Sequence, residues 1–260
     1  MTFHELRTGT GTPVVLLHAF PLDHRMWLDV ADALEGRTVL AVDLPGSAGS
    51  PPDRPEPSVD AAADRLAAQL DAAGVGHAVV AGLSMGGYVA LALAERRPDL
   101  VAALGLVDTK STADTDDARA NRLRIAAEAD EQGTVAPVRP MAQTLLGAST
   151  RNARPELQEQ VAQWIEEQPP AGVAWSQRAM AARPDRTDVL AAFAGPAVVV
   201  VGAEDTLTPL DQAEHMAAAA SAPLVVVPAA GHLSALERPA AVAAALDELV
   251  GRTDAGLNAG

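Results

Sequence analysis

A single serine stands between glycines in the stretch "GLSMG", residues 82–86. This G-x-S-x-G pattern is informative only where a strand precedes it and a helix follows, and here an apolar run precedes it and an Ala-rich helical pattern follows. A sharp turn from strand to helix needs small neighbours, which Gly82 and Gly86 provide. Ser84 is therefore a candidate nucleophile, and the alternative is a serine that only caps the helix.

A serine hydroxyl is a weak nucleophile at neutral pH, so it needs a base and an orienting acid elsewhere in the chain. His232 follows the last apolar run and precedes the last helix, at the sheet edge where open α/β sheets place their chemistry. Asp205, which gives the chain order Ser84, Asp205, His232, is the favoured acid. Asp108 ends the strand after the nucleophile helix and stays open as the alternative, as does Glu204 or no acid at all.

The remaining histidines are expected to have other roles. His18 ends a strand at the same edge, and the apolar residues after it favour packing and hydrogen bonding. His24 could reach the rim of a pocket, whereas structural or solvent roles are expected for His4, His77 and His215. No metal is expected, because His18 and His24 fit no standard zinc spacing.

Short β-branched runs alternate with Ala-rich helical patterns, which predicts an α/β fold with a mostly parallel, doubly wound sheet. We expect six strands, at 13–20, 38–44, 77–82, 101–108, 196–205 and 222–232. We expect the core helices near 27–35, 58–73, 85–97, 209–220 and 236–250. Between the fourth and fifth runs, only helical patterns broken by prolines appear, which predicts an inserted all-helical cap.

The expected domain organisation is a core of residues 1–109 and 194–250, a helical cap of 110–193 and a disordered tail of 251–260. The chain has 260 residues, 48% of them hydrophobic, which suits one large α/β domain. A formal charge of −15 argues against nucleic acid or an anionic membrane as a partner. The chain has no cysteine, no apolar leader and no run of membrane-spanning length, so we expect a cytoplasmic protein.

Together the stretches "LLHAF", "AVDLPGSAGS", "AGLSMGGYVALALAERRPDLVAALGLVD", "VVVVGAEDTLTP" and "PAAGHLSALERP" resemble the α/β-hydrolase superfamily, in particular its small esterase and enol-lactonase-like group. The resemblance implies that Ser84 is the nucleophile, Asp205 the acid and His232 the base. It also implies that the backbone amides of Phe20 and Met85 form the oxyanion hole, and that no cofactor is needed.

The chain departs from the family pattern in two places. His18-Ala19 stands where the family usually has His-Gly, which could narrow the acyl pocket without removing the Phe20 amide. The stretch "GSAGS", residues 46–50, stands where Gly-His-Gly-x-Ser is usual. Because little sequence precedes the first predicted strand, the opening β-hairpin of the family is expected to be shortened or lost.

The resemblance implies a serine hydrolase that acts by two-step acyl transfer on a small-molecule substrate. A mostly apolar cap suits a small, uncharged ester or lactone. The candidate pocket residues are Trp27, Met141, Trp164, Trp175, Met180, Leu207 and Leu233. Two alternatives use the same fold: an acyltransferase, peptidase or perhydrolase with this triad, and a binding protein without catalysis.

Overall fold

The computed structural model describes residues 1–47, 49–51 and 56–259. It contains a seven-stranded sheet whose strands follow the order β1-β3-β2-β4-β5-β6-β7. The strands are β1 (Thr2–Arg7), β2 (Thr10–Leu17), β3 (Arg37–Asp43), β4 (Ala78–Leu83), β5 (Val101–Val107), β6 (Ala197–Gly202) and β7 (Leu224–Val227). All neighbouring strands are parallel except β1, which runs antiparallel to β3, and this confirms the predicted fold class.

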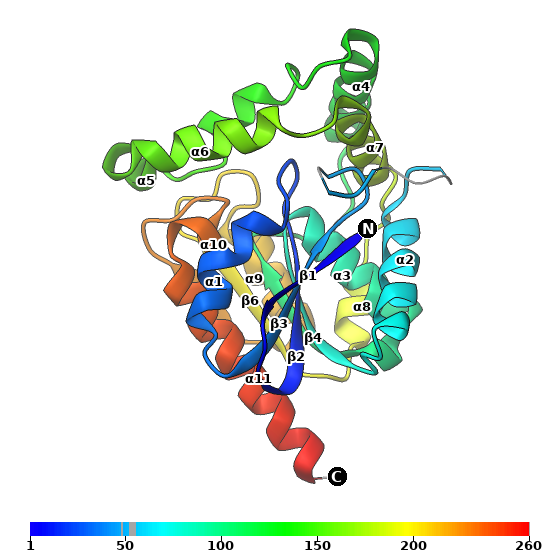
Figure 1. Cartoon of the computed structure of the whole chain (residues 1–260), viewed down its shortest axis with the longest axis vertical. Helices are drawn as coiled ribbons and strands as arrows, with labels where there is room; N and C mark the ends of the chain where they lie inside the picture. The colour runs from blue at the N-terminus through cyan, green and yellow to red at the C-terminus, as the bar shows by residue number, and fades with distance from the viewer. Residues whose placement is uncertain (48, 52–55, 260) are drawn as a thin grey trace.

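Central strands of the sheet are apolar on both faces, because helices cover both sides. Every residue of β4 and of β6 is buried, as expected of strands inside a doubly covered parallel sheet. Helices α1 and α11 lie on one side of the sheet, and α2, α3 and α8 lie on the other (Figure 1).

Four of the five expected core helices lie within two residues of their predicted bounds, whereas the last, expected near 236–250, runs from Pro239 to Ala259. The core helices are η1 (His24–Trp27), α1 (Leu28–Ala33), α2 (Val59–Ala72), α3 (Met85–Arg96), η2 (Pro98–Leu100), α9 (Leu210–Ala220), α10 (Ser234–Glu237) and α11 (Pro239–Ala259). Local capping explains where α2 begins, because the Ser58 side chain accepts a hydrogen bond from the Ala61 N–H.

The insertion between β5 and β6 is helical, with α4 (Asp116–Gln132), η3 (Arg139–Gln143), α5 (Ala148–Ala153), α6 (Pro155–Glu166), α7 (Pro170–Ala181) and α8 (Thr187–Ala192). Helices α4 to α7 form a separate layer beyond one end of the sheet (Figure 1). The expected cap boundary at residue 193 lies too late, because α8 packs against α3 and α9 of the core.

Both ends of the chain differ from the expectation. Strand β1 is present, although the opening of the family fold was expected to be shortened or lost, and it pairs with β3 from Thr2 onward. The predicted disordered tail is wrong for residues 251–259, because α11 continues through them. Asp254 holds this end of the helix, since its side chain accepts hydrogen bonds from the Thr12 N–H and hydroxyl at 3.1 and 2.7 Å.

Ala48 of the "GSAGS" stretch and Gly260 of the predicted tail lie outside the described residues. None of the helices described is both long enough and apolar enough to cross a membrane.

Candidate active site

Ser84 lies at the sharp turn between β4 and α3, with φ 54° and ψ −112°. This conformation depends on the adjacent glycines. A Cβ on Gly86 would lie 2.1 Å from the Leu17 carbonyl oxygen, and one on Gly82 would lie 2.2 Å from the Gly86 backbone. The Ser84 side chain makes no capping hydrogen bond to α3, so its hydroxyl is free to face the sheet edge.

The structure brings the serine together with the predicted base and acid. His232 Nε2 lies 2.9 Å from Ser84 Oγ, and His232 Nδ1 lies 2.9 Å from Asp205 Oδ2. The Asp205 carboxylate also accepts hydrogen bonds from the Leu207 N–H at 2.8 Å and the Thr208 hydroxyl at 2.6 Å. Asp205 and His232 are both buried, and the hydrogen bond between them holds the imidazole ring in a fixed orientation.

Asp108, the alternative acid, is engaged elsewhere. One of its oxygens accepts from the Gly202 N–H at 2.8 Å, and the other accepts from the Ser234 N–H at 3.0 Å and hydroxyl at 2.5 Å. Glu204 lies at the cap instead, where it accepts a hydrogen bond from the Ser149 N–H. Of the three acids considered from the sequence, Asp205 is the one hydrogen-bonded to His232.

Electrostatics in this cluster follow from burial and proximity. Burial alone would lower the pKa of His232, but the hydrogen bond and charge of Asp205 outweigh it and raise the pKa above 6.5. Burial would raise the pKa of Asp205, yet His232 holds it below the usual range. Burial, followed by the negative charge of Asp205, raises the pKa of Asp108 to about 7.

The predicted oxyanion hole consists of the backbone amides of Met85 and Phe20. Met85 is the first residue of α3, and the first N–H groups of a helix have no acceptor within it. Phe20 lines the same cavity as Ser84 and His232. The oxyanion role of both amides stays a prediction.

A cavity of about 330 Å³ opens beside Ser84, between the sheet edge and the cap. Of the predicted pocket residues, Met141, Met180 and Leu207 line it. The other four do not, and in their case the pocket prediction is wrong. Trp27 and Leu233 are completely buried, Trp175 is 8% exposed, and Trp164 packs under the Arg25 guanidinium, where α6 of the cap meets the core.

Sequence reasoning missed the charged lining of this cavity. Lys110, just past β5, and Asp114, Asn121 and Arg122, before and on α4, all line it together with Gln177 of α7. Helical patterns rich in charge usually indicate a solvated face, so these residues gave no signal on their own. The spacing of Lys110 from Asp108, two residues beyond the edge of the sheet, is the one feature that could have placed a cation near the site.

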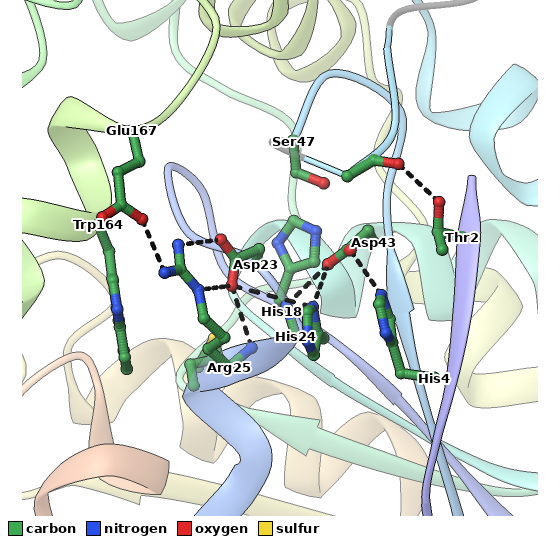
Figure 2. A network of polar contacts seen from close by, with 12 residues as sticks. Thr2, His4, His18, Asp23, His24, Arg25, Asp43, Ser47, Trp164 and Glu167 are labelled. Atoms are coloured by element: carbon green, nitrogen blue, oxygen red, sulfur yellow. Dashed lines mark hydrogen bonds and ion pairs between the residues drawn. The ribbon is translucent and has the colours of Figure 1, made fainter.

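Three of the other histidines, His4, His18 and His24, lie in a network of polar contacts beside the sheet, seen in Figure 2. His18 Nε2 accepts the Leu44 N–H at 2.9 Å, so the expected packing and hydrogen-bonding role is confirmed. His24 does not line the Ser84 cavity. The rings of His4 and His24 stack 3.5 Å apart and contact Asp43, at 2.7 Å from His4 Nε2 and 2.9 Å from His24 Nδ1.

His4, His24 and Asp43 also have the donor types of a metal site, although no metal is expected from the sequence. The three donor atoms of His4, His24 and Asp43 lie within 4.8 Å of one another, close enough to share an ion. Each ring, however, directs its nitrogen at a different oxygen of the same carboxylate, as hydrogen-bond partners do. No local pattern predicts this group, because His4, His24 and Asp43 are distant in the sequence and only the pairing of β1 with β3 brings them together.

The same network ties the cap to the core. The Arg25 guanidinium forms two hydrogen bonds with Asp23, at 2.8 and 2.7 Å, and reaches Glu167 at the end of α6 at 2.7 Å (Figure 2). Its planar group lies 5.2 Å from the centre of the Trp164 ring. The cap is therefore held over the sheet edge by a partly buried arginine.

Comparison with known proteins points to one family. The alpha/beta hydrolase fold family matches residues 12–239, most of the chain. A solved esterase from Thermogutta terrifontis, described as malate bound, is 38% identical with a TM-score of 0.92 over 97% of this chain and 93% of that one. The enol-lactonase of Burkholderia xenovorans LB400 has a TM-score of 0.85 at 23% identity, over 96% and 95% of the chains, which shows a shared fold.

A curated relative matches over a shorter region. Lipase LipV of Mycobacterium tuberculosis is 42% identical over 107 residues, which is 40% of this chain and 41% of the lipase. The match therefore spans less than half the length of that relative.

Proposed function

The chain belongs to the alpha/beta hydrolase fold family, and on this premise we propose that it is a serine hydrolase that cleaves a carboxylic ester or lactone through an acyl-enzyme. One observation carries the proposal: the hydrogen-bonded series Ser84 Oγ, His232 Nε2, His232 Nδ1 and Asp205 Oδ2, with 2.9 Å at both contacts. The esterase from Thermogutta terrifontis, 38% identical, supports the choice of reaction.

In the first step Ser84 Oγ attacks the carbonyl carbon, and its proton passes to His232 Nε2. Because the Asp205 carboxylate can only accept, it favours the tautomer with the proton on Nδ1, which leaves Nε2 free as the base. The amides of Met85 and Phe20 stabilise the negative carbonyl oxygen. The bond to the leaving oxygen then breaks, and that oxygen takes the proton from Nε2.

The second step repeats the first with water. His232 Nε2 removes a proton from a water molecule, whose oxygen attacks the acyl carbon. The bond from that carbon to Ser84 Oγ breaks as Nε2 returns the proton to the serine, and the free acid leaves. Transfer of the acyl group to another nucleophile would follow the same path, with the acceptor in place of water.

The decisive test of this proposal is labelling of the nucleophile. A fluorophosphonate probe is expected to label the chain once, at Ser84, and Ser84→Ala is expected to abolish both labelling and ester turnover. Ser221→Gly is the matched control, because it removes an exposed hydroxyl at a φ of 49°, which glycine adopts freely. Labelling that survives in Ser84→Ala would overturn the proposal.

Product analysis separates hydrolysis from acyl transfer. Turnover of one ester in the presence of increasing methanol or a primary amine is expected to yield mainly the free acid. A product mixture dominated by the new ester or amide at low acceptor concentration would instead favour an acyltransferase.

A further inference from the structure

Positive charge gathers in the cavity beside Ser84, although the chain as a whole carries −15. Lys110 and Arg122 both line the cavity, and Asp114 is the one carboxylate among its described lining residues. Lys110 Nζ lies 3.2 Å from one Asp114 oxygen, and Arg122 Nε donates to the other at 2.6 Å. The cavity therefore holds more cations than anions.

A third cation, Arg183, also pairs with Asp114. Arg183 Nη2 donates to Asp114 at 2.8 Å, and both side chains are almost fully buried, at 2% and 3% exposure. The Arg183 guanidinium lies 4.0 Å from the centre of the Tyr88 ring, which fixes its position. Three cations surround the single Asp114 carboxylate, so the cluster as a whole carries a surplus of positive charge.

Donor groups on both side chains are also available. Arg122 Nη1 donates to Gln177 Oε1 at 3.2 Å, but Arg122 Nη2 has no hydrogen-bond acceptor within the described parts of the chain. In the same parts, Asp114 is the only ionic partner of Lys110. The two side chains are 22% and 20% exposed, so water or a ligand can reach them.

The cation pair is positioned relative to the nucleophile. The Thr109 hydroxyl donates to the Ser84 carbonyl oxygen at 2.8 Å, so the next residue, Lys110, begins beside the elbow. Arg122 lies on α4 of the cap and meets Lys110 at the Asp114 carboxylate, which both side chains contact. A ligand whose reacting carbonyl meets Ser84 would thus have its other end beside a cluster that joins one core cation to one cap cation.

From this arrangement we infer that the substrate carries a carboxylate, bound by Lys110 and Arg122, in addition to the ester or lactone group that meets Ser84. The inference names the substrate class of the proposed function and rests on it for the reacting end. Asp114 supports a carboxylate in particular, because the same two side chains already bind one in this geometry. The apolar side chains of Ile125, Met141 and Leu207 would contact the carbon chain between the two ends.

The test compares two esters that differ in one end group. The 4-nitrophenyl monoester of glutaric acid and 4-nitrophenyl pentanoate have acyl chains of equal length, but only the first carries a carboxylate. We expect the protein to favour the glutarate ester by more than ten-fold in kcat/KM, and the preference to shrink as salt rises from 0.05 to 0.5 M. A preference of about one would overturn the inference.

Variants locate the preference. Arg122→Gln and Lys110→Met are each expected to lower the ratio of the two kcat/KM values by ten-fold or more. Arg124→Gln is the matched control, since it removes the same charge from the same helix at a side chain that is 57% exposed and paired with Glu128. If neither Arg122→Gln nor Lys110→Met lowered the ratio below that of Arg124→Gln, both cations would have only structural ion pairs, against the inference.

A binding measurement keeps this inference separate from the proposed chemistry. Monomethyl glutarate is titrated calorimetrically into Ser84→Ala, with and without Arg122→Gln, after thermal melts show that both variants fold. We expect a binding signal that Arg122→Gln weakens at least ten-fold, whether or not the wild type hydrolyses esters. Binding with no turnover would refute the serine hydrolase alone, whereas turnover without Arg122-dependent binding would refute the carboxylate site alone.

Discussion

Asp205 and Asp108 end neighbouring parallel strands and both lie close to His232, yet their hydrogen-bond partners differ. Asp205 contacts the imidazole directly, while Asp108 accepts from Gly202 and Ser234. The sequence could place both at the same edge because strand ends meet there. Chain order favoured Asp205 and left Asp108 open, since only the fold brings the Ser234 hydroxyl to Asp108 across 126 positions of chain.

Substitution of the two acids is therefore expected to have unequal effects. Asp205→Asn should lower kcat/KM for an ester by roughly 10⁴, because an amide at this place favours the wrong His232 tautomer. Asp108→Asn should cost less than about ten-fold in kcat/KM but lower the free energy of unfolding by about 1–3 kcal/mol, since a buried N–H loses its acceptor. Steady-state kinetics and denaturant melts on both variants measure this, and the reverse order of activities would assign the triad acid to Asp108.

The pH profile of the reaction should report His232. Its pKa is raised above 6.5 in the folded chain, and Nε2 must be unprotonated to act as a base. Activity should therefore be lost as pH falls through a value above 6.5, in plots of kcat/KM for a neutral ester against pH. Asp108, with a pKa of about 7, titrates in the same region, so the profile of Asp108→Asn is the control. A midpoint at or below 6.5 in both proteins would contradict the assignment.

At the scale of elements, the sequence predicted the sheet and the elbow well, because both depend on local patterns. Fully apolar runs predict central parallel strands, and the two glycines beside Ser84 are required by the backbone alone. The cap shows the limit of such patterns. Trp164 and Trp175 of the cap, like Trp27 of the core, are large apolar side chains of the kind that often line pockets. Hydrophobicity alone does not tell which face of a helix meets the cavity and which meets the core.

Local sequence patterns also fail to predict which charged residues line the cavity. Lys110 and Arg122 have the character of surface residues in the sequence, and only the docking of α4 over the sheet edge brings Arg122 to the cavity that Lys110 lines from the core. Their burial is made possible by the Asp114–Arg183 pair, a contact across 69 residues that no local pattern predicts.

The turn between β4 and α3 is expected to require glycine at position 86, and a substitution there tests this requirement. Gly86→Ala should lower the free energy of unfolding by about 3 kcal/mol or more, because the new Cβ would meet the Leu17 carbonyl oxygen at 2.1 Å, a backbone atom that cannot yield. Gly251→Ala is the control, since nothing lies within 4 Å of its Cβ position in α11. Helix propensity predicts that it raises stability by about 0.5–1 kcal/mol.

Urea or thermal unfolding of both glycine variants measures the difference. Labelling of Ser84 by the fluorophosphonate probe should fall in Gly86→Ala and stay unchanged in Gly251→Ala. Similar stability and labelling in both variants would mean that the elbow tolerates a side chain.

Over the whole molecule, charge is distributed unevenly. The formal charge of −15 resides mainly on exposed acidic residues, while the Ser84 cavity carries a surplus of cations. An anionic substrate is thus repelled by most of the surface and attracted at one place. In the sequence, the net charge argued against nucleic acid and anionic membranes, and the apolar cap suggested an uncharged substrate. Neither feature shows how the fold distributes charge over the surface.

The distribution of the site along the chain also governs when it can exist during synthesis. Ser84 is translated first, Asp205 some 120 residues later and His232 later still, and α11, which follows His232, covers one face of the sheet. A nascent chain that ends at about residue 200 thus has a nucleophile without its acid and base, and a sheet without this covering helix. Acyl chemistry by a nascent chain therefore requires synthesis to pass His232.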